Sequence, residues 1–201
     1  MRKPLTICAI LILPVLAYAA AANGFVTTRP DARYGDDSYN FSADTVIASK
    51  FTAPSSGTLT ITEIGGFYDG TTGSVIHMAI FTDDGTYPES IVTNSDSGEI
   101  DTSSSVLTSA TYATYGTQPT VTGGQNYWIA AIFGTAPTQF SRFASGGSSA
   151  YRAAGISYPT WPTPAEWEGA STGASDYSGY VVYTGGDSET SGGMLLLGVG
   201  N

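Results

Sequence analysis

The sequence predicts an all-β protein, a two-sheet β-sandwich of jelly-roll type with about ten short strands. From Phe41 onward, apolar runs rich in Val, Ile, Thr, Tyr and Phe alternate with clusters of Gly, Ser, Thr, Asp and Pro. The runs recur roughly every 8 to 12 residues, a spacing typical of sandwiches. No window carries a helical apolar stripe, and 25 glycines with 10 prolines would interrupt one. Ten strands in one domain require two packed sheets.

The first 22 residues have the features of a secretory signal peptide. Arg2 and Lys3 precede an apolar run from Leu5 to Leu16, and small residues follow it. The run is too short for a bilayer, which needs roughly 20 apolar residues. We therefore expect cleavage after Ala19 or Ala22. The product would be secreted, extracellular or at the cell surface, with no membrane span after processing.

The mature chain would have no disulfide and a strong negative charge. Its one cysteine, Cys8, lies in the signal peptide, so stability must come from a hydrophobic core. Processing removes two of the seven basic residues and none of the seventeen acidic ones, leaving five against seventeen, a formal charge of −12. This charge disfavours nucleic acid and anionic membrane surfaces as partners. About 180 residues suit one domain.

The expected strands combine β-branched and aromatic residues and are bounded by turn residues. In order, they are residues 46–53, 57–68, 74–82, 90–95, 105–113, 117–122, 125–133, 138–144, 177–184 and 194–199.

The domain organisation follows from these runs. Residues 41–184 form the sandwich domain. Residues 23–40 form a polar leader, which we expect to be ordered only where it pairs with a sheet edge. Residues 185–201 join a glycine-rich link to an apolar strand, MLLLGV. That strand either completes the fold or adds to the open edge of a neighbouring copy, which would give self-association.

The run SVIHMAIF holds the only histidine of the chain. Strand alternation places Ile76, Met78 and Ile80 on one face and His77 on the less apolar face. The residues DDG that follow favour a hairpin turn. His77 is therefore expected to belong to a plain strand that ends in a turn.

Four segments carry a resemblance to a known domain family: GTLTITEIGGFYD, GSVIHMAIFTDDGTYPES, GGQNYWIAAIF and YPTWPTPAEWEG before YVVYT. In this order, over residues 44–184, the chain resembles an uncharacterised jelly-roll-like β-sandwich domain of bacterial secreted, cell-surface and phage-associated proteins. It departs from the pattern at Phe81, where tyrosine is usual, and at His77, where a basic residue is common. The resemblance implies a fold often found beside carbohydrate-active or adhesive modules, and it implies no catalytic residues.

The sequence favours a protein that is not an enzyme. With one histidine, no mature cysteine and no G-x-S-x-G turn, it lacks the groups of nucleophilic catalysis. Glu166 and Glu168 form the best carboxylate pair, because an extended segment would place them on one face roughly 6.5 to 7 Å apart, a spacing compatible with glycoside hydrolysis. Their loop is rich in Pro, Ser and Gly, so we expect solvated acids and keep a glycosidase as an alternative.

Calcium is the one cofactor that the acidic residues suggest. Calcium takes about six to eight oxygen ligands, and the segment NSDSGEID offers Asp96, Glu99 and Asp101 beside turn carbonyls. No EF-hand pattern is complete, and turn formation on a soluble surface explains the same residues.

The aromatic loop 151–170 is the best candidate for a ligand site. Aromatic rings held by prolines offer flat faces that stack on sugar rings, and neighbouring polar groups could bond sugar hydroxyls. The stacking candidates are Tyr151, Tyr158, Trp161 and Trp167, and the polar candidates are Arg152, Glu166 and Glu168. Alternatively, these aromatics fold back and cap an open end of the sandwich.

These observations favour a non-catalytic carbohydrate-binding or adhesive module that binds a glycan or polysaccharide outside the cell. The alternative is a structural subunit of an extracellular or phage-like assembly, joined by edge-strand contacts.

Overall fold

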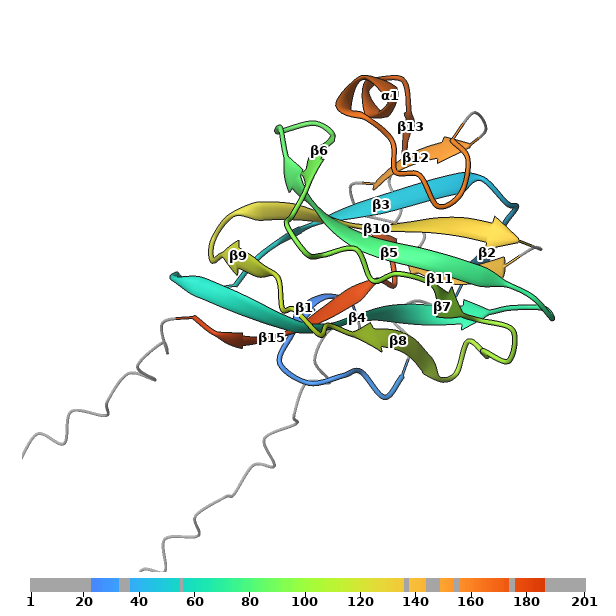
Figure 1. Cartoon of the computed structure of the whole chain (residues 1–201), viewed down its shortest axis with the longest axis horizontal. Coiled ribbons are helices and arrows are strands. Elements are labelled where there is room, and N and C mark those ends of the chain that lie inside the picture. Colours follow the sequence, from blue (N-terminus) through green and yellow to red (C-terminus); the bar gives the residue numbers. More distant parts are fainter. Residues whose placement is uncertain are drawn as a thin grey trace, which may run out of the picture.

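The computed structural model describes residues 23–32, 37–54, 56–135, 138–143, 149–153, 156–173 and 176–186. Within these ranges the chain forms two β-sheets stacked face to face (Figure 1). The prediction of an all-β, two-sheet sandwich is confirmed. The predicted signal peptide, 1–22, and the predicted strand 194–199 lie outside the described residues.

One sheet has eight strands, five of them in the order β1-β15-β4-β11-β14. β2 also pairs with β11, and β8 and β9 pair with the long strand β4. Its strands are β1 (Gly24–Val26), β2 (Asp37–Phe41), β4 (Thr58–Asp69), β8 (Ala110–Thr114), β9 (Thr120–Thr122), β11 (Thr138–Phe143), β14 (Asp176–Tyr177) and β15 (Tyr180–Gly185).

The other sheet has seven strands, six of them in the order β13-β12-β3-β10-β5-β6, with β7 paired to β5. Its strands are β3 (Thr45–Thr52), β5 (Val75–Asp83), β6 (Pro88–Ile91), β7 (Ile100–Asp101), β10 (Asn126–Thr135), β12 (Ser149–Ala153) and β13 (Ser171–Gly173). The one helix of the described chain is α1 (Pro164–Glu168), and no helix there is long and apolar enough to cross a membrane.

The main core fills the space between the two sheets. Alternate residues of β5, namely Ile76, Met78 and Ile80, are fully buried there, as strand alternation predicts. Leu59 and Ile61 of β4 belong to the same cluster from the opposite sheet. The inward faces of β4, β5 and β10 thus supply most of the apolar contact that joins the layers.

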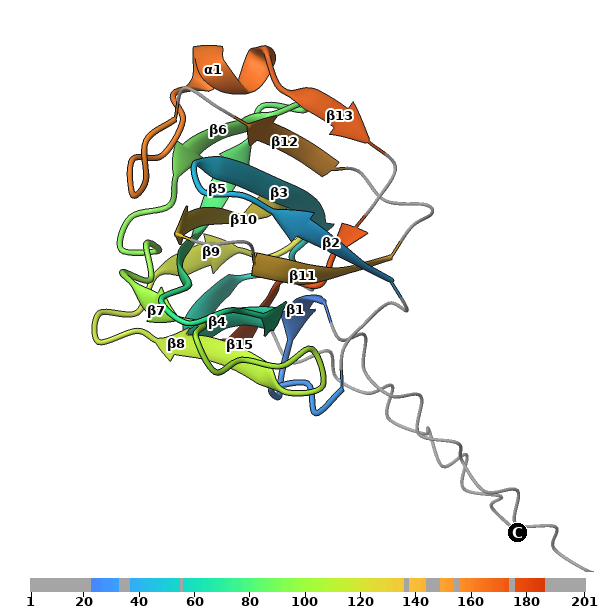
Figure 2. The same ribbon diagram turned by 90° about the vertical axis from the view of Figure 1, so that its right-hand side faces the viewer.

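A second apolar cluster covers the outer face of the seven-stranded sheet. Phe81 of β5 and Trp128 of β10 point away from the main core, yet each is only 1% exposed. The chain that leads into α1 and α1 itself lie over this face, at the end of the molecule away from β4 and β8 (Figure 2). The central strands β3, β5 and β10 are therefore buried on both faces.

The predicted leader, 23–40, contains β1 and all of β2 except its last residue, Phe41. β1 pairs in parallel with β15, and β2 pairs antiparallel with β11. The segment after β1 is held by Arg29, whose Nε donates to Glu63 at 2.7 Å, while the Tyr180 hydroxyl donates to the same carboxylate at 2.9 Å. Glu63 is buried, so this ion pair and hydrogen bond satisfy its charge.

Several predicted strand boundaries are wrong. The predicted strand 90–95 ends at Ile91 in β6, and the predicted strand 105–113 begins only at Ala110 in β8. The predicted strand 177–184 divides at Ser178 and Gly179 into β14 and β15, which pair with β11 and β4 respectively. Each of these segments contains turn residues, which end the pairing of the backbone with one neighbouring strand before the next pairing begins.

Removing the Trp167 side chain should destabilise the fold, because its ring is fully buried in the outer cluster. We expect Trp167→Ala to lower the free energy of unfolding by about 3 to 5 kcal/mol, measured by urea denaturation. The Trp167 indole N–H has no acceptor among the described residues. Trp167→Phe, which keeps a ring and removes that N–H, should therefore cost clearly less. A loss below about 1 kcal/mol for the alanine variant would contradict a core role.

Candidate binding site

The segment that follows β6 runs beside β5 and is fixed to it by two serines. The Ser95 hydroxyl accepts the backbone N–H of Ile80 at 3.1 Å and donates to the same residue's carbonyl at 3.0 Å. The Ser97 hydroxyl accepts the N–H of Met78 at 2.9 Å. These bonds satisfy backbone N–H and C=O groups of β5 that would otherwise pair with a neighbouring strand. Because both neighbours are held in this way, Asp96 is fixed between them.

Asp96 joins this segment to the sheet and to the aromatic loop. Its Oδ1 lies 3.1 Å from Nδ1 of His77 and accepts the backbone N–H of Gly98 at 2.9 Å. Its Oδ2 accepts the indole N–H of Trp161 at 2.9 Å. The Asp96 side chain is nevertheless 42% exposed. One exposed carboxylate therefore orients a ring of the loop and the histidine of β5.

Tyr158 is held by contacts from several elements. Its backbone N–H donates to Asp44 at 2.9 Å, its hydroxyl lies 3.5 Å from Oε2 of Glu99, and its ring meets His77 edge-on with centroids 5.1 Å apart. Burial, and then the Glu99 carboxylate, raise the pKa of Tyr158 above its usual value. A Cβ on Gly134 would lie only 2.8 Å from the tyrosine ring, so glycine there allows the ring to rest on β10.

The two tryptophans of the loop have different environments. Both meet Phe81 edge-on, with centroids 5.4 Å away for Trp161 and 5.8 Å for Trp167. Trp161 is partly exposed, whereas Trp167 is 0% exposed. The expectation that Trp167 stacks on a ligand is not met in this structure, because its ring belongs to the core. The loop caps a sheet face, and among the aromatic rings of the described residues 156–170 Tyr158 and Trp161 keep partial access to solvent.

Tyr151 and Arg152, expected in the loop, belong to β12. They pair there with Ile47 and Val46 of β3. The run SAYRA thus extends the sheet, and the loop itself begins only after β12.

Glu166 and Glu168 do not form the expected pair. They lie in α1, where residues two apart do not face each other. Glu166 accepts the backbone N–H of Thr163 at 2.7 Å in a capping box, while Glu168 is exposed. The extended geometry assumed for a glycosidase is therefore absent from this segment.

The expected calcium ligands do not converge. Asp96 is directed to His77 and Trp161, Glu99 to Tyr158, and Asp101 to the N–H of Ser103 at 2.8 Å. Nowhere in the described ranges do three His, Cys, Asp or Glu side chains gather closely enough to hold a metal ion.

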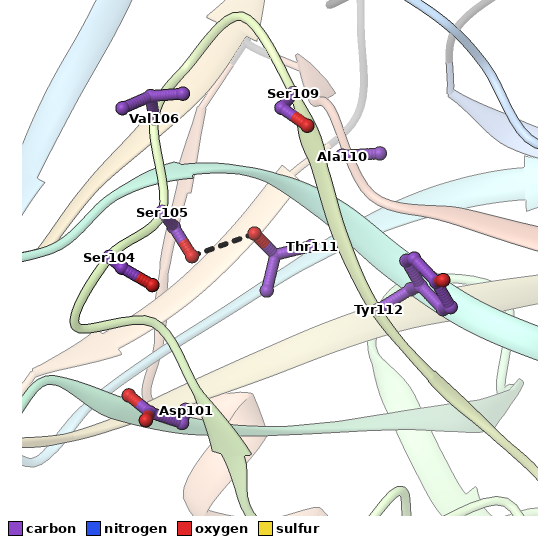
Figure 3. Close-up of a pocket in the computed structure, with 8 residues that line it drawn as sticks. All are labelled: Asp101, Ser104, Ser105, Val106, Ser109, Ala110, Thr111 and Tyr112. Atoms are coloured by element: carbon purple, nitrogen blue, oxygen red, sulfur yellow. Dashed lines mark hydrogen bonds between the residues drawn. The ribbon is translucent and has the colours of Figure 1, made fainter.

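Beyond β7 the chain forms an open pocket of about 360 Å³, which we call the hydroxyl pocket. The hydroxyls of Ser105 and Thr111 face each other and hydrogen-bond at 2.7 Å, with Asp101 and Tyr112 to either side of them (Figure 3). Hydrogen bonds from Ser103 lower the pKa of Asp101, a carboxylate that already accepts hydrogen bonds at neutral pH. The lining residues are Asp101, Ser104, Ser105, Val106, Ser109, Ala110, Thr111 and Tyr112.

Tyr112, at one side of the hydroxyl pocket, is positioned by two distant residues. The guanidinium of Arg29 lies 3.3 Å from the centre of the tyrosine ring, and Glu63 anchors that guanidinium. A Cβ on Gly65 would lie 2.7 Å from the Tyr112 Cβ, so glycine allows β8 to approach β4. The Tyr112 residue is still 40% exposed.

Sequence reasoning missed the hydroxyl pocket. The available signal was the hydroxyl-rich segment DTSSSVLTSATY, which was assigned in part to a strand. This composition is equally typical of turns and of a polar binding site. In addition, the two residues that position Tyr112, namely Arg29 and Gly65, are distant from it in the sequence, so no local pattern reveals the pocket.

No protein-family model matches the chain, and no curated protein matches it. The resemblance to the jelly-roll-like domain therefore stays a prediction.

Removing the Asp96 carboxylate should loosen the loop. In Asp96→Ala the Trp161 indole loses its acceptor, so we expect faster amide hydrogen exchange at residues 158–161 and a loss of about 1 to 2 kcal/mol in unfolding free energy. Hydrogen-exchange mass spectrometry measures the first effect. Glu168→Ala, which removes an exposed carboxylate from α1, is the matched control and should leave exchange there unchanged. Equal exchange in the two variants would contradict the role given to Asp96.

Arg29→Met should leave the Glu63 carboxylate buried with the Tyr180 hydroxyl as its main remaining donor. We expect a loss of about 2 kcal/mol in unfolding free energy in denaturant titrations. The double variant Arg29→Met, Glu63→Gln should recover part of the loss, because no unpaired charge remains. A double variant less stable than the single one would show that the charge is not the cause.

Proposed function

We propose that this protein is a non-catalytic carbohydrate-binding or adhesive module acting outside the cell, and that it binds a saccharide in the hydroxyl pocket. The observation that supports this best is the combination of groups in one open pocket: an ionised Asp101, the hydroxyls of Ser104, Ser105, Ser109 and Thr111, and the partly exposed ring of Tyr112. The predicted signal peptide supports the extracellular location.

The chemistry of the hydroxyl pocket suits a sugar. Sugar hydroxyls can donate to the Asp101 carboxylate and exchange hydrogen bonds with Ser105 and Thr111. The carbon-bound hydrogens of a sugar ring can pack on the part of the Tyr112 ring that Arg29 leaves exposed. The volume of 360 Å³ lies near the lower end of the range of about 300 to 1,000 Å³ for small-molecule sites, which favours one or two sugar units.

The alternative, a subunit of an assembly joined by edge strands, has less support. Along one edge of β5, β6 pairs with one end of the strand and β7 pairs with the other end. Between these two pairings, Ser95 and Ser97 already bond the backbone of β5. Pro88 begins β6 and cannot donate a ladder bond. These features limit the addition of a foreign strand at this edge.

The proposal is tested by measuring binding of the processed chain, residues 23–201, to neutral and charged glycans, with and without EDTA. We expect a neutral saccharide to bind without a metal, and Asp101→Asn and Ser105→Ala each to weaken it by about tenfold through lost hydrogen bonds.

The matched controls are Asp31→Asn and Ser90→Ala, which change exposed residues outside the pocket. They should bind as the unaltered protein does. Absence of binding by a folded sample, or equal affinity in the pocket variants and the controls, would overturn the proposal.

A further inference from the structure

The hydroxyl pocket is connected to the aromatic loop by one short segment. Asp101 lines the pocket, Glu99 two residues earlier contacts the Tyr158 hydroxyl, and Asp96 holds the Trp161 indole. The chain between β6 and β7 runs from the α1 end of the molecule toward β8 in both views (Figures 1 and 2). The pocket and the two partly exposed rings therefore flank the same segment.

The distance between these features is short. Asp101 follows Asp96 by five positions in the chain, and a fully extended chain of five residue steps spans at most about 18 Å. We use the name aromatic surface for Asp96, Glu99, Tyr158 and Trp161. A ligand of several sugar units could contact the hydroxyl pocket and the aromatic surface at once.

The rings of the aromatic surface are fixed in place. Tyr158 is bonded to Asp44 and rests on Gly134, and Trp161 is bonded to Asp96 and packed on Phe81. A ligand that stacks on them pays little further loss of side-chain entropy.

From this geometry we infer that the protein binds a neutral polysaccharide over several units, with one unit in the hydroxyl pocket and further units against Tyr158 and Trp161. This inference rests on the proposed function and names the ligand class of its site. Hydroxyl groups along such a chain donate to Asp96, Glu99 and Asp101.

The negative charge of the protein surface between the hydroxyl pocket and the aromatic surface explains why the bound polysaccharide should be neutral. Asp96, Glu99 and Asp101 are all exposed, no lysine or arginine is among the residues that line the pocket, and Arg29, which lies against Tyr112, is paired with Glu63. A polysaccharide that carries carboxylates or sulfates meets like charges along its length, whereas neutral hydroxyls meet acceptors.

The test is calorimetric titration of the processed chain with cello-, N-acetylchito-, malto- and manno-oligosaccharides, from monosaccharide to hexasaccharide. For the series that binds, we expect affinity to rise at least about tenfold with length and then level off. Oligogalacturonates of the same lengths should not bind. In Tyr158→Ala and Trp161→Ala the length-dependent gain should disappear while the monosaccharide binds as before. Tyr39→Ala, an exposed ring on β2, is the matched control and should keep the gain.

A second measurement needs no variant and covers the case in which a loop variant fails to fold. In the unaltered protein, the hexasaccharide should slow amide exchange at residues 158–161, whereas the monosaccharide should not. Equal affinity at all lengths, or an unchanged loop on hexasaccharide binding, overturns the inference and leaves the proposed function standing. Failure of every saccharide to bind folded protein overturns both.

Discussion

The burial of β3, β5 and β10 on both faces is the constraint on which the rest of the structure depends. Their inward residues pack on the eight-stranded sheet, and their outward residues, including Phe81 and Trp128, need a second cover. Exposing apolar area costs roughly 25 cal/mol per Å², so the chain around α1 must stay in place. Trp167, together with Ile156, provides the buried part of that cover. The remaining rings, Tyr158 and Trp161, form its partly exposed margin.

The same constraint explains how a loop can offer a rigid surface. Two serines fix the segment before β7 to β5, and Asp96 between them bonds the cover on one side and the sheet on the other. The hydroxyl pocket has a separate origin. The segment after β1 brings Arg29 onto Tyr112, and the buried Glu63 holds Arg29 there. The proposed ligand path thus joins two regions that are stabilised independently.

The fold could be predicted from the sequence because its signals are local. The alternation in SVIHMAIF put Ile76, Met78 and Ile80 on one face of a strand, the face that is buried in the core, and the run QNYWIAAIF predicted the strand that is β10. The site was harder, because burial of Trp167 depends on a loop that folds over distant strands. The five residues of α1 are too few for helical periodicity, although the capping box TPAE was present. The hydroxyl pocket depends on contacts from Arg29 and Gly65, which no local pattern reveals.

The most direct test of this account is a titration of ¹⁵N-labelled processed protein with the neutral hexasaccharide that binds best, followed by backbone amide shifts. The account predicts shift changes in two groups, residues 99–112 around the hydroxyl pocket and residues 158–161 in the loop. The amides of β9 and of Tyr39 should stay unchanged, because they lie outside the proposed path. Shift changes confined to other strands, or to neither group, would contradict it.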